Sequence, residues 1–131
     1  MNLQRKQEIM RECLQDACIG WKNLPHLIFT SHLRTTAGRA ITHRVGSKIV
    51  SQEIEMNIAI LNLNPLIAGL DTLFHELAHL IVERESPGNA HGEVWKKIYA
   101  DLTGKSTKEV QARHALIVPK KKEGNTATVK F

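Results

Sequence analysis

Cysteine is scarce in this sequence and long apolar runs are absent, and each absence excludes a class of protein. Cys13 and Cys18 are the two cysteines; both fall in a stretch patterned as one helix, which does not suit a disulfide. No apolar run approaches the roughly 20 residues that span a bilayer. The charged N-terminal stretch also lacks the apolar segment of a secretory signal. We therefore expect a cytoplasmic protein with no membrane span and a reduced pair of thiols.

Aromatic residues make up only 5% of the chain, but hydrophobic residues make up 42% of its 131 positions. A chain of this length suits one compact domain, which buries roughly 65–70% of its unfolded surface without needing a disulfide or a metal as a staple. We predict a single domain over residues 1–118. The stretch 119–131 reads as a basic, partly disordered C-terminal tail.

Acidic residues are missing from residues 31–52 and concentrated in residues 53–93, which hold seven acids against one base, Arg84. From Val94 onward, nine basic residues face three acids, and the total net charge is +5. An acidic block suits a divalent cation, and basic flanks suit a polyanion such as DNA, for which Lys120, Lys121 and Lys122 are candidate phosphate contacts. An unevenly charged, solvated surface is an equally good interpretation.

The hydrophobic pattern predicts an α+β fold. Apolar residues recur at helical spacing near the N-terminus, and later Ile54, Met56, Ile58 and Ile60 alternate with other residues as in a half-buried strand. The predicted elements are an N-terminal helix over 3–19 and a small three-stranded, mainly antiparallel sheet from strands at 26–30, 37–45 and 52–61.

Helices are predicted for the second half of the domain. Asn64-Pro65 is a typical helix start, and Gly69 is a place where the helix that follows could break. Ser106 and Glu109 form a capping box ahead of the last helix. The predicted helices cover residues 66–84, 91–102 (ending at Gly104) and 107–116.

The sequence His75-Glu76-Leu77-Ala78-His79 carries the clearest chemical signal in the chain. Residues four apart project from the same face of a helix, so the imidazoles of His75 and His79 can reach one ion without distorting the backbone. Zinc accepts imidazole nitrogen at about 2.0–2.1 Å and prefers tetrahedral surroundings. Glu76 lies about 100° further around the helix, a position suited to a general base beside the water of the site.

A catalytic zinc site needs a third protein ligand and one open position. His91 is the best candidate, because the turn signal Ser-Pro-Gly-Asn before it can bring the next helix back towards the first. Glu83, Glu85 and His114 are weaker alternatives. One zinc ion per chain is therefore expected, held by His75, His79 and His91.

The rest of the motif helix is apolar almost all round, so it should be buried, and two histidines and a glutamate would be buried with it. Metal binding would offset that cost. The alternative is a metal-free scaffold in which the histidines are packing residues. Asp71 or Glu83, on the same stripe, could accept the outer ring N–H of a ligand histidine, or be ordinary exposed charges.

Residues 74–98, FHELAHLIVERESPGNAHGEVWKKI, resemble the active-site segment of the SprT-like metallopeptidases, the family of bacterial SprT and eukaryotic Spartan. The matching pattern is HExxH, a variable turn, His-Gly and a nearby aromatic: His75, Glu76, His79, His91-Gly92 and Trp95. The resemblance extends over roughly residues 25–115. It implies a minimal zincin-type fold, with Trp95 as a core residue that supports His91.

The resemblance also implies a function: zinc-dependent hydrolysis of peptide bonds, with unfolded, DNA-bound or DNA-crosslinked proteins as substrates. Tyr99 and His114 are both candidates for stabilising the oxyanion. One departure from the family is that no cysteine follows Cys18, so the zinc ribbon of paired CxxC motifs that many members carry is absent from this sequence. A non-catalytic, zinc-stabilised nucleic-acid-binding module is the main alternative.

Overall fold

The structure is a computed structural model that describes residues 1–85, 92–104, 115–119 and 126–130; in the last two stretches it describes the backbone and the side chain of Leu116. Two of the predicted site residues, His91 and His114, lie outside this part of the chain. The order of the described elements is α1 (Leu3–Ala17), β1 (His26–Thr30), β2 (Gly38–Val45), β3 (Lys48–Asn57), α2 (Ile58–Leu63), α3 (Leu66–Glu85), α4 (Glu93–Thr103), β4 (Ala115–Pro119) and β5 (Thr126–Lys130).

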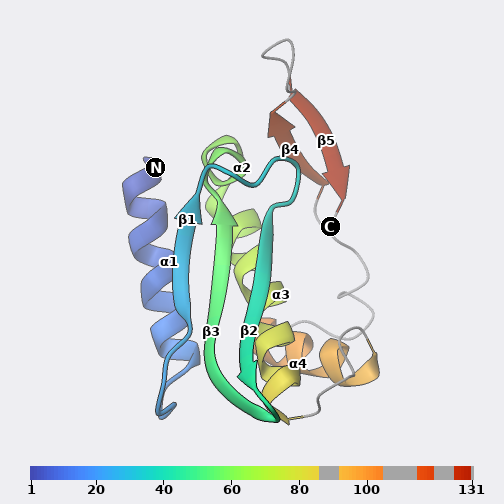
Figure 1. Ribbon diagram of the computed structural model, residues 1–131. Helices are drawn as coiled ribbons and strands as arrows, with labels where there is room; N and C mark the ends of the chain where they lie inside the picture. The colour runs from blue at the N-terminus through green and yellow to red at the C-terminus, as the bar shows by residue number, and fades with distance from the viewer. Residues whose placement is uncertain (86–91, 105–114, 120–125, 131) are drawn as a thin grey trace.

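A three-stranded sheet forms one layer, with β3 in the middle and β1 and β2 at its two edges. The helices α1 and α3 lie together behind this sheet (Figure 1). The β2–β3 pair is antiparallel, as predicted, but β1 runs parallel to β3, so the sheet is mixed rather than mainly antiparallel. The reason is topological: after β1 the chain crosses the sheet to the far edge before the β2–β3 hairpin brings it back to the centre.

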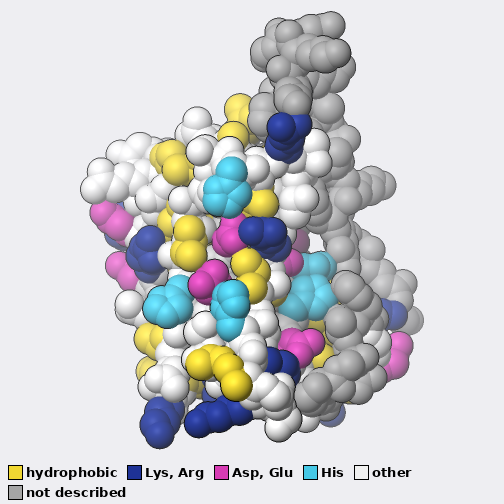
Figure 2. All heavy atoms as spheres, in the orientation of Figure 1, with side chains coloured by type: hydrophobic (Ala, Val, Ile, Leu, Met, Phe, Trp, Pro, Cys, Tyr) yellow, Lys and Arg dark blue, Asp and Glu magenta, His cyan; other side chains and the backbone are white. Residues whose placement is uncertain are grey.

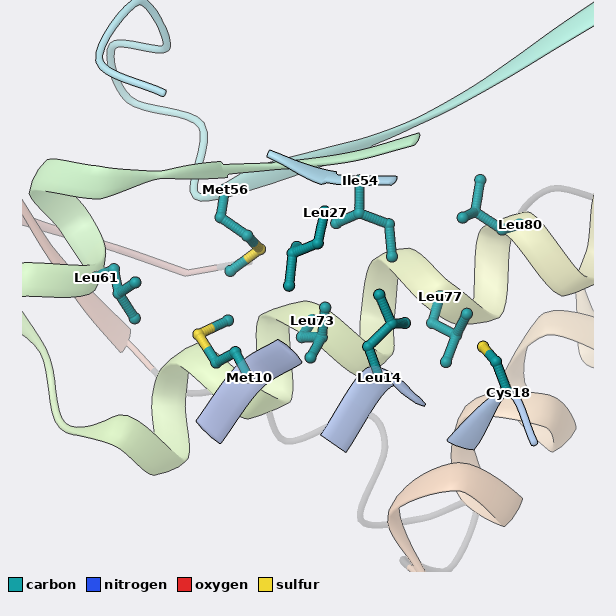
Figure 3. Close-up of a cluster of buried hydrophobic side chains, with 10 residues drawn as sticks. All are labelled: Met10, Leu14, Cys18, Leu27, Ile54, Met56, Leu61, Leu73, Leu77 and Leu80. Carbon is teal, nitrogen blue, oxygen red and sulfur yellow. The ribbon is translucent and has the colours of Figure 1, made fainter. Parts of the chain in front are cut away.

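The core lies between the sheet and the two helices. Its side chains come from α1, from the inward faces of β1 and β3, and from one side of α3, where Leu73, Leu77 and Leu80 are fully buried. Figure 3 shows Ile54 and Met56 pointing from the sheet towards Leu73 and Leu77 on α3, with Met10 and Leu14 of α1 closing the cluster. This packing fixes which side of α3 faces away from the core.

Several predicted boundaries are corrected. The strand predicted to run to residue 61 ends at Asn57, and Ile58 to Leu61 are helical, in α2. The physical reason is the Asn57 side chain, which accepts hydrogen bonds from the backbone N–H groups of Ala59 and Ile60 and so caps a new helix. No break occurs at Gly69, which sits inside the continuous helix α3.

The described C-terminal part of the chain also differs from the prediction. Ala115 and Leu116, expected at the end of a helix, belong to β4, which pairs antiparallel with β5 in a separate two-stranded sheet. The remainder of the helix predicted over 107–116, with its capping box, lies outside the described residues. Leu116 is buried with Ala37, Ile60 and Ala68, so β4 packs against the domain. Part of the predicted tail is therefore a strand, and the domain limit at residue 118 stays a prediction.

Candidate metal centre

The helix α3 carries His75 and His79 on the side away from its core leucines, and the buried Glu76 lies between that side and the leucines. Leu73, Leu77 and Leu80 face the sheet at spacings of four and three residues, and His75 lies about 200° around the helix from Leu73. The hydrophobic packing of α3 therefore determines the direction in which the two histidines point. Both are partly buried, whereas Glu76 is buried, with 7% of its surface exposed.

The two imidazoles converge. The Nε2 atoms of His75 and His79 lie 3.3 Å apart, and potential ligand atoms of His75, Glu76 and His79 all lie within 4.8 Å of one another. Two nitrogens bound tetrahedrally to one zinc ion at 2.0–2.1 Å are separated by about 3.3 Å. The pair thus fits a shared metal ion, and within the described part of the chain this is the one such cluster of His, Cys, Asp and Glu.

The third ligand predicted from the sequence, His91, lies outside the described residues, as does its alternative His114. The other two alternatives are described. Glu83 accepts a hydrogen bond from Arg44 at 2.9 Å, and Glu85 is exposed at the end of α3. Neither belongs to the converging group. His91 therefore stays the predicted third ligand, on the segment that joins α3 to α4.

The helix α4 encloses the histidine pair with aromatic side chains. The Trp95 ring stacks on His79, with centroids 5.2 Å apart and an interplanar angle of 24°, and meets His75 edge-on at 4.7 Å. Its indole N–H donates to the backbone carbonyl of His75 at 3.3 Å. The sequence predicted Trp95 as a support for His91. The structure shows that it contacts the two histidines of α3 directly.

Tyr99, one helical turn after Trp95, stacks on the indole at 5.2 Å and lies 6.0 Å from the His75 ring. Its hydroxyl donates a hydrogen bond to Oδ1 of Asp71. Asp71, predicted as a partner for a histidine ring N–H, is thus tied to α4 through Tyr99. The sequence held a signal for this arrangement, because Trp95 and Tyr99 are four residues apart and share one face of α4.

A groove of about 410 Å³ runs beside the centre, between the edge strand β2 and α3. Ala40 and Thr42 line it from the strand, and Glu76, His79 and Leu80 line it from the helix. One of its ends is bounded by Arg44, whose guanidinium donates to the side chain and to the backbone carbonyl of Glu83 at 2.9 and 2.7 Å. Sequence reasoning missed this pair, because its partners are far apart in the chain and Arg44 follows a shift in the β2–β3 register.

Other features of the chain agree with the sequence analysis. Cys13 and Cys18 are both free. Within the described residues, no helix combines the length and the apolar character needed to cross a membrane.

Comparison with known proteins gives one family. The model of the SprT-like family matches residues 6–115, a range that contains the sheet, the helix α3 and the helix α4. Neither the curated proteins nor the solved structures contain a match to this chain. This match covers most of the sequence and includes the helix on which the two histidines converge. The chain therefore belongs to the SprT-like family.

Proposed function

We propose that this chain is a zinc-dependent metallopeptidase of the zincin type. The observation that carries the proposal is the convergence of His75 and His79, whose Nε2 atoms lie 3.3 Å apart, with the buried carboxylate of Glu76 beside them on a groove. Membership of the SprT-like family is consistent with a metallopeptidase-like function. A purely structural zinc site would have no use for the glutamate in that groove.

In this proposal, His75, His79 and His91 hold the metal, and the fourth position stays open. Zinc, when bound, supplies Lewis-acid activation of a water molecule and of the scissile carbonyl. Glu76 acts as general base and then general acid: its carboxylate takes a proton from the attacking water and delivers it to the leaving amine. The burial of Glu76 beside Leu80 keeps bulk water away from this proton transfer.

Trp95 and Tyr99 prepare the site for this chemistry. The stacking of Trp95 on His79 and its edge contact with His75 restrict the orientation of both imidazoles. Tyr99 is the described candidate for stabilising the oxyanion, and His114 is the other candidate. The Tyr99 hydroxyl proton is directed at Asp71, so Tyr99 can donate to an oxyanion only when it releases that carboxylate.

The groove suggests the kind of substrate. β2 is an edge strand and forms one wall of the groove, so an extended peptide can pair with it as a further strand and place a carbonyl near His79. This mode of binding favours unfolded or flexible protein segments, because a folded element does not present a free strand edge. We include proteins bound or crosslinked to DNA among the proposed substrates on the strength of the family resemblance.

The test is cleavage of a denatured protein by purified chain, with and without zinc, chelator and single-stranded DNA. Glu76→Gln is expected to keep one zinc per chain by elemental analysis and to lose cleavage by at least about a hundredfold. Glu53→Gln removes a carboxylate from the outer face of the sheet and serves as the matched control. Full cleavage by Glu76→Gln would remove Glu76 from the mechanism.

The same assay separates the alternatives. Zinc bound without any cleavage, together with retained DNA binding, would favour the zinc-stabilised nucleic-acid-binding module. A chain that binds no zinc would be the metal-free scaffold. The variant His91→Ala tests the third ligand, because the proposal expects it to lose zinc while remaining folded by circular dichroism.

A further inference from the structure

A second and larger cavity lies beyond the Arg44–Glu83 pair. Its volume is about 780 Å³, within the range of small-molecule sites. The loop between α1 and β1, the β2–β3 hairpin and the C-terminal end of α3 form its walls, and we name it the basal cleft. Figure 2 shows Lys and Arg side chains gathered along this lower end of the molecule.

The charge of the basal cleft is positive. Lys22, Arg44 and Arg84 line it against a single carboxylate, that of Glu83. The neutral lining is rich in hydrogen-bonding groups, including Asn23, Ser47 and Ser51. Three cations around one cavity of this size disfavour a cationic or purely apolar ligand and favour an anion that carries more than one charge.

The two arginines are held so that donors remain for a ligand. The Arg84 guanidinium lies over the Trp21 ring, 4.0 Å from its centroid. A cation–π contact needs no hydrogen-bond acceptor, so the N–H donors of Arg84 can still bind a ligand. Arg44 is fixed by three hydrogen bonds, to Glu83 twice and to the Ser47 carbonyl, so within the described part of the chain two of its five donors remain.

We propose that the basal cleft binds a phosphate group. A planar guanidinium matches two phosphate oxygens at once, and a flexible lysine adds a point charge, so Arg84, Lys22 and the remaining donors of Arg44 form a set suited to that anion. The phosphate can come from a small phosphate ester or from the end of a nucleic-acid strand. This proposal does not depend on the peptidase reaction, because His75, His79 and Trp95 of the metal centre are not among the lining residues.

The chain supplies its own pair of reporters. It has two tryptophans, Trp21 in the basal cleft and Trp95 at the metal centre, so a ¹⁵N–¹H spectrum contains two indole N–H signals. Titration of the full chain with inorganic phosphate, adenosine monophosphate or a 5′-phosphorylated single-stranded oligonucleotide should shift the Trp21 signal and leave the Trp95 signal in place. Zinc should do the reverse.

Substitutions then assign the contact. Arg84→Gln should weaken binding at least about tenfold, because a charged hydrogen-bond donor is lost. Lys22→Gln tests charge alone, since Lys22 is exposed and its substitution leaves the Trp21–Arg84 stack intact. Arg5→Gln is the matched control: it removes an arginine from the exposed face of α1, where it pairs with Glu8.

Binding of adenosine monophosphate as tight as that of the oligonucleotide would identify a small ester as the source. An oligonucleotide preference that requires the 5′-phosphate would identify a strand end. The proposal is overturned if no phosphate probe moves Trp21 more than chloride does at equal ionic strength, or if Arg5→Gln weakens binding as much as Arg84→Gln. If zinc does not shift the Trp95 signal, this result counts against the proposed metal centre but not against phosphate binding in the basal cleft.

Discussion

The buried side chain of Asn57 forms hydrogen bonds both to the loop before β2 and to the start of α2. Its side-chain amide donates towards the backbone carbonyls of Leu33, Arg34 and Thr36 at 3.0–3.2 Å, which holds the crossing between β1 and β2. Its side-chain carbonyl caps α2, and 1% of the residue is exposed. One buried asparagine side chain thus provides hydrogen-bond partners for the backbone carbonyls of a loop and for the backbone N–H groups at the start of a helix.

Replacing Asn57 tests this role. Asn57→Ala should lower the free energy of unfolding by about 2–4 kcal/mol, because a helix cap and several buried carbonyls lose their partner. Asn57→Asp keeps the cap but turns an oxygen towards those carbonyls, so it should not rescue stability at neutral pH. Urea unfolding measures both, with the exposed Asn62→Ala as control. Equal stability of Asn57→Ala and Asn62→Ala would contradict the role.

Glu55 is a buried carboxylate on the outer face of β3. The Arg39 guanidinium, which donates to it at 2.9 Å, lowers the pKa of Glu55 below its ordinary value; burial opposes this shift, and His32 assists it. The pKa is lower in the folded state, so ionised Glu55 contributes stability above about pH 4.5. That contribution is lost as the pH falls through the folded pKa.

Arg39→Gln should therefore destabilise the protein by about 1 kcal/mol at pH 7, where a charged hydrogen bond is lost. The difference from the natural sequence should shrink as the pH falls below 4, because Glu55 becomes protonated in both proteins. Urea unfolding at pH 7 and pH 3 measures the two differences. Arg34→Gln, an exposed arginine whose side chain has no described partner, is the control. A difference that grows on acidification would refute this account.

At the scale of single residues, the sequence predicted which side chains of one helix converge, but not the contacts between residues far apart in the chain. His75, Glu76 and His79 were found because helical geometry alone brings positions four apart to one face. Asn57 and Arg44 act on partners that are distant in the sequence, and no local pattern reports such partners. Trp95 was identified as structural, but its contact with the histidine rings depends on how α4 crosses α3, which the sequence does not encode locally.

At the scale of elements, local patterns placed β1, β2, α3 and α4 within a residue or two of their observed ends. The error at the end of β3 has a specific cause. Ile58 and Ile60 continue the two-residue alternation of the strand, but they also suit a short helix. The N-cap hydrogen bonds of Asn57 favour the helix. Strand direction was a second kind of error, since a sequence pattern does not say whether neighbouring strands run parallel.

Gly69 lies inside the unbroken helix α3 and allows α2 to pack closely against it. A Cβ at this position would lie 2.7 Å from Cδ1 of Leu61 and 3.6 Å from the sulfur of Met10. The missing side chain lets two buried residues from α1 and α2 approach the α3 backbone. The glycine therefore allows close packing. This packing offsets the cost of a glycine inside a helix, which is about 1 kcal/mol relative to alanine.

Gly69→Ala should consequently destabilise the protein by about 1 kcal/mol, because displacement of the buried Leu61 outweighs the gain in helix propensity. In a Leu61→Ala background the clash is gone, and the same substitution should stabilise by up to about 1 kcal/mol. Urea unfolding of the four proteins gives the coupling energy. A Gly69→Ala effect of the same sign and size in both backgrounds would show that the close approach is unimportant.

At the scale of the whole molecule, the two histidines lie where α4 packs on α3, beside a hydrophobic cluster that includes Ala78, Val82 and Ala100. α3 packs against the sheet through its leucines, and α4 packs against α3 through Trp95 and Tyr99 around the histidine rings. A metal ion held by His75, His79 and His91 would connect α3 to the segment leading into α4. It would bind the folded chain far better than the unfolded one, so metal binding and folding should be coupled.

Zinc should therefore raise the melting temperature. At a free zinc concentration a thousand times its dissociation constant, the added stability is about 4 kcal/mol, which corresponds to roughly 10–20 °C for a domain of this size. Chelator should reverse the rise.

Differential scanning calorimetry with and without zinc measures this rise. The quantity to compare between variants is the zinc-dependent increment in melting temperature, because substitutions also change the stability of the metal-free protein. His79→Ala and His91→Ala should both lose the increment, because each removes a proposed zinc ligand. His43→Ala, on the outer face of the sheet and half exposed, should keep it. A full increment in His79→Ala would place the zinc elsewhere in the chain.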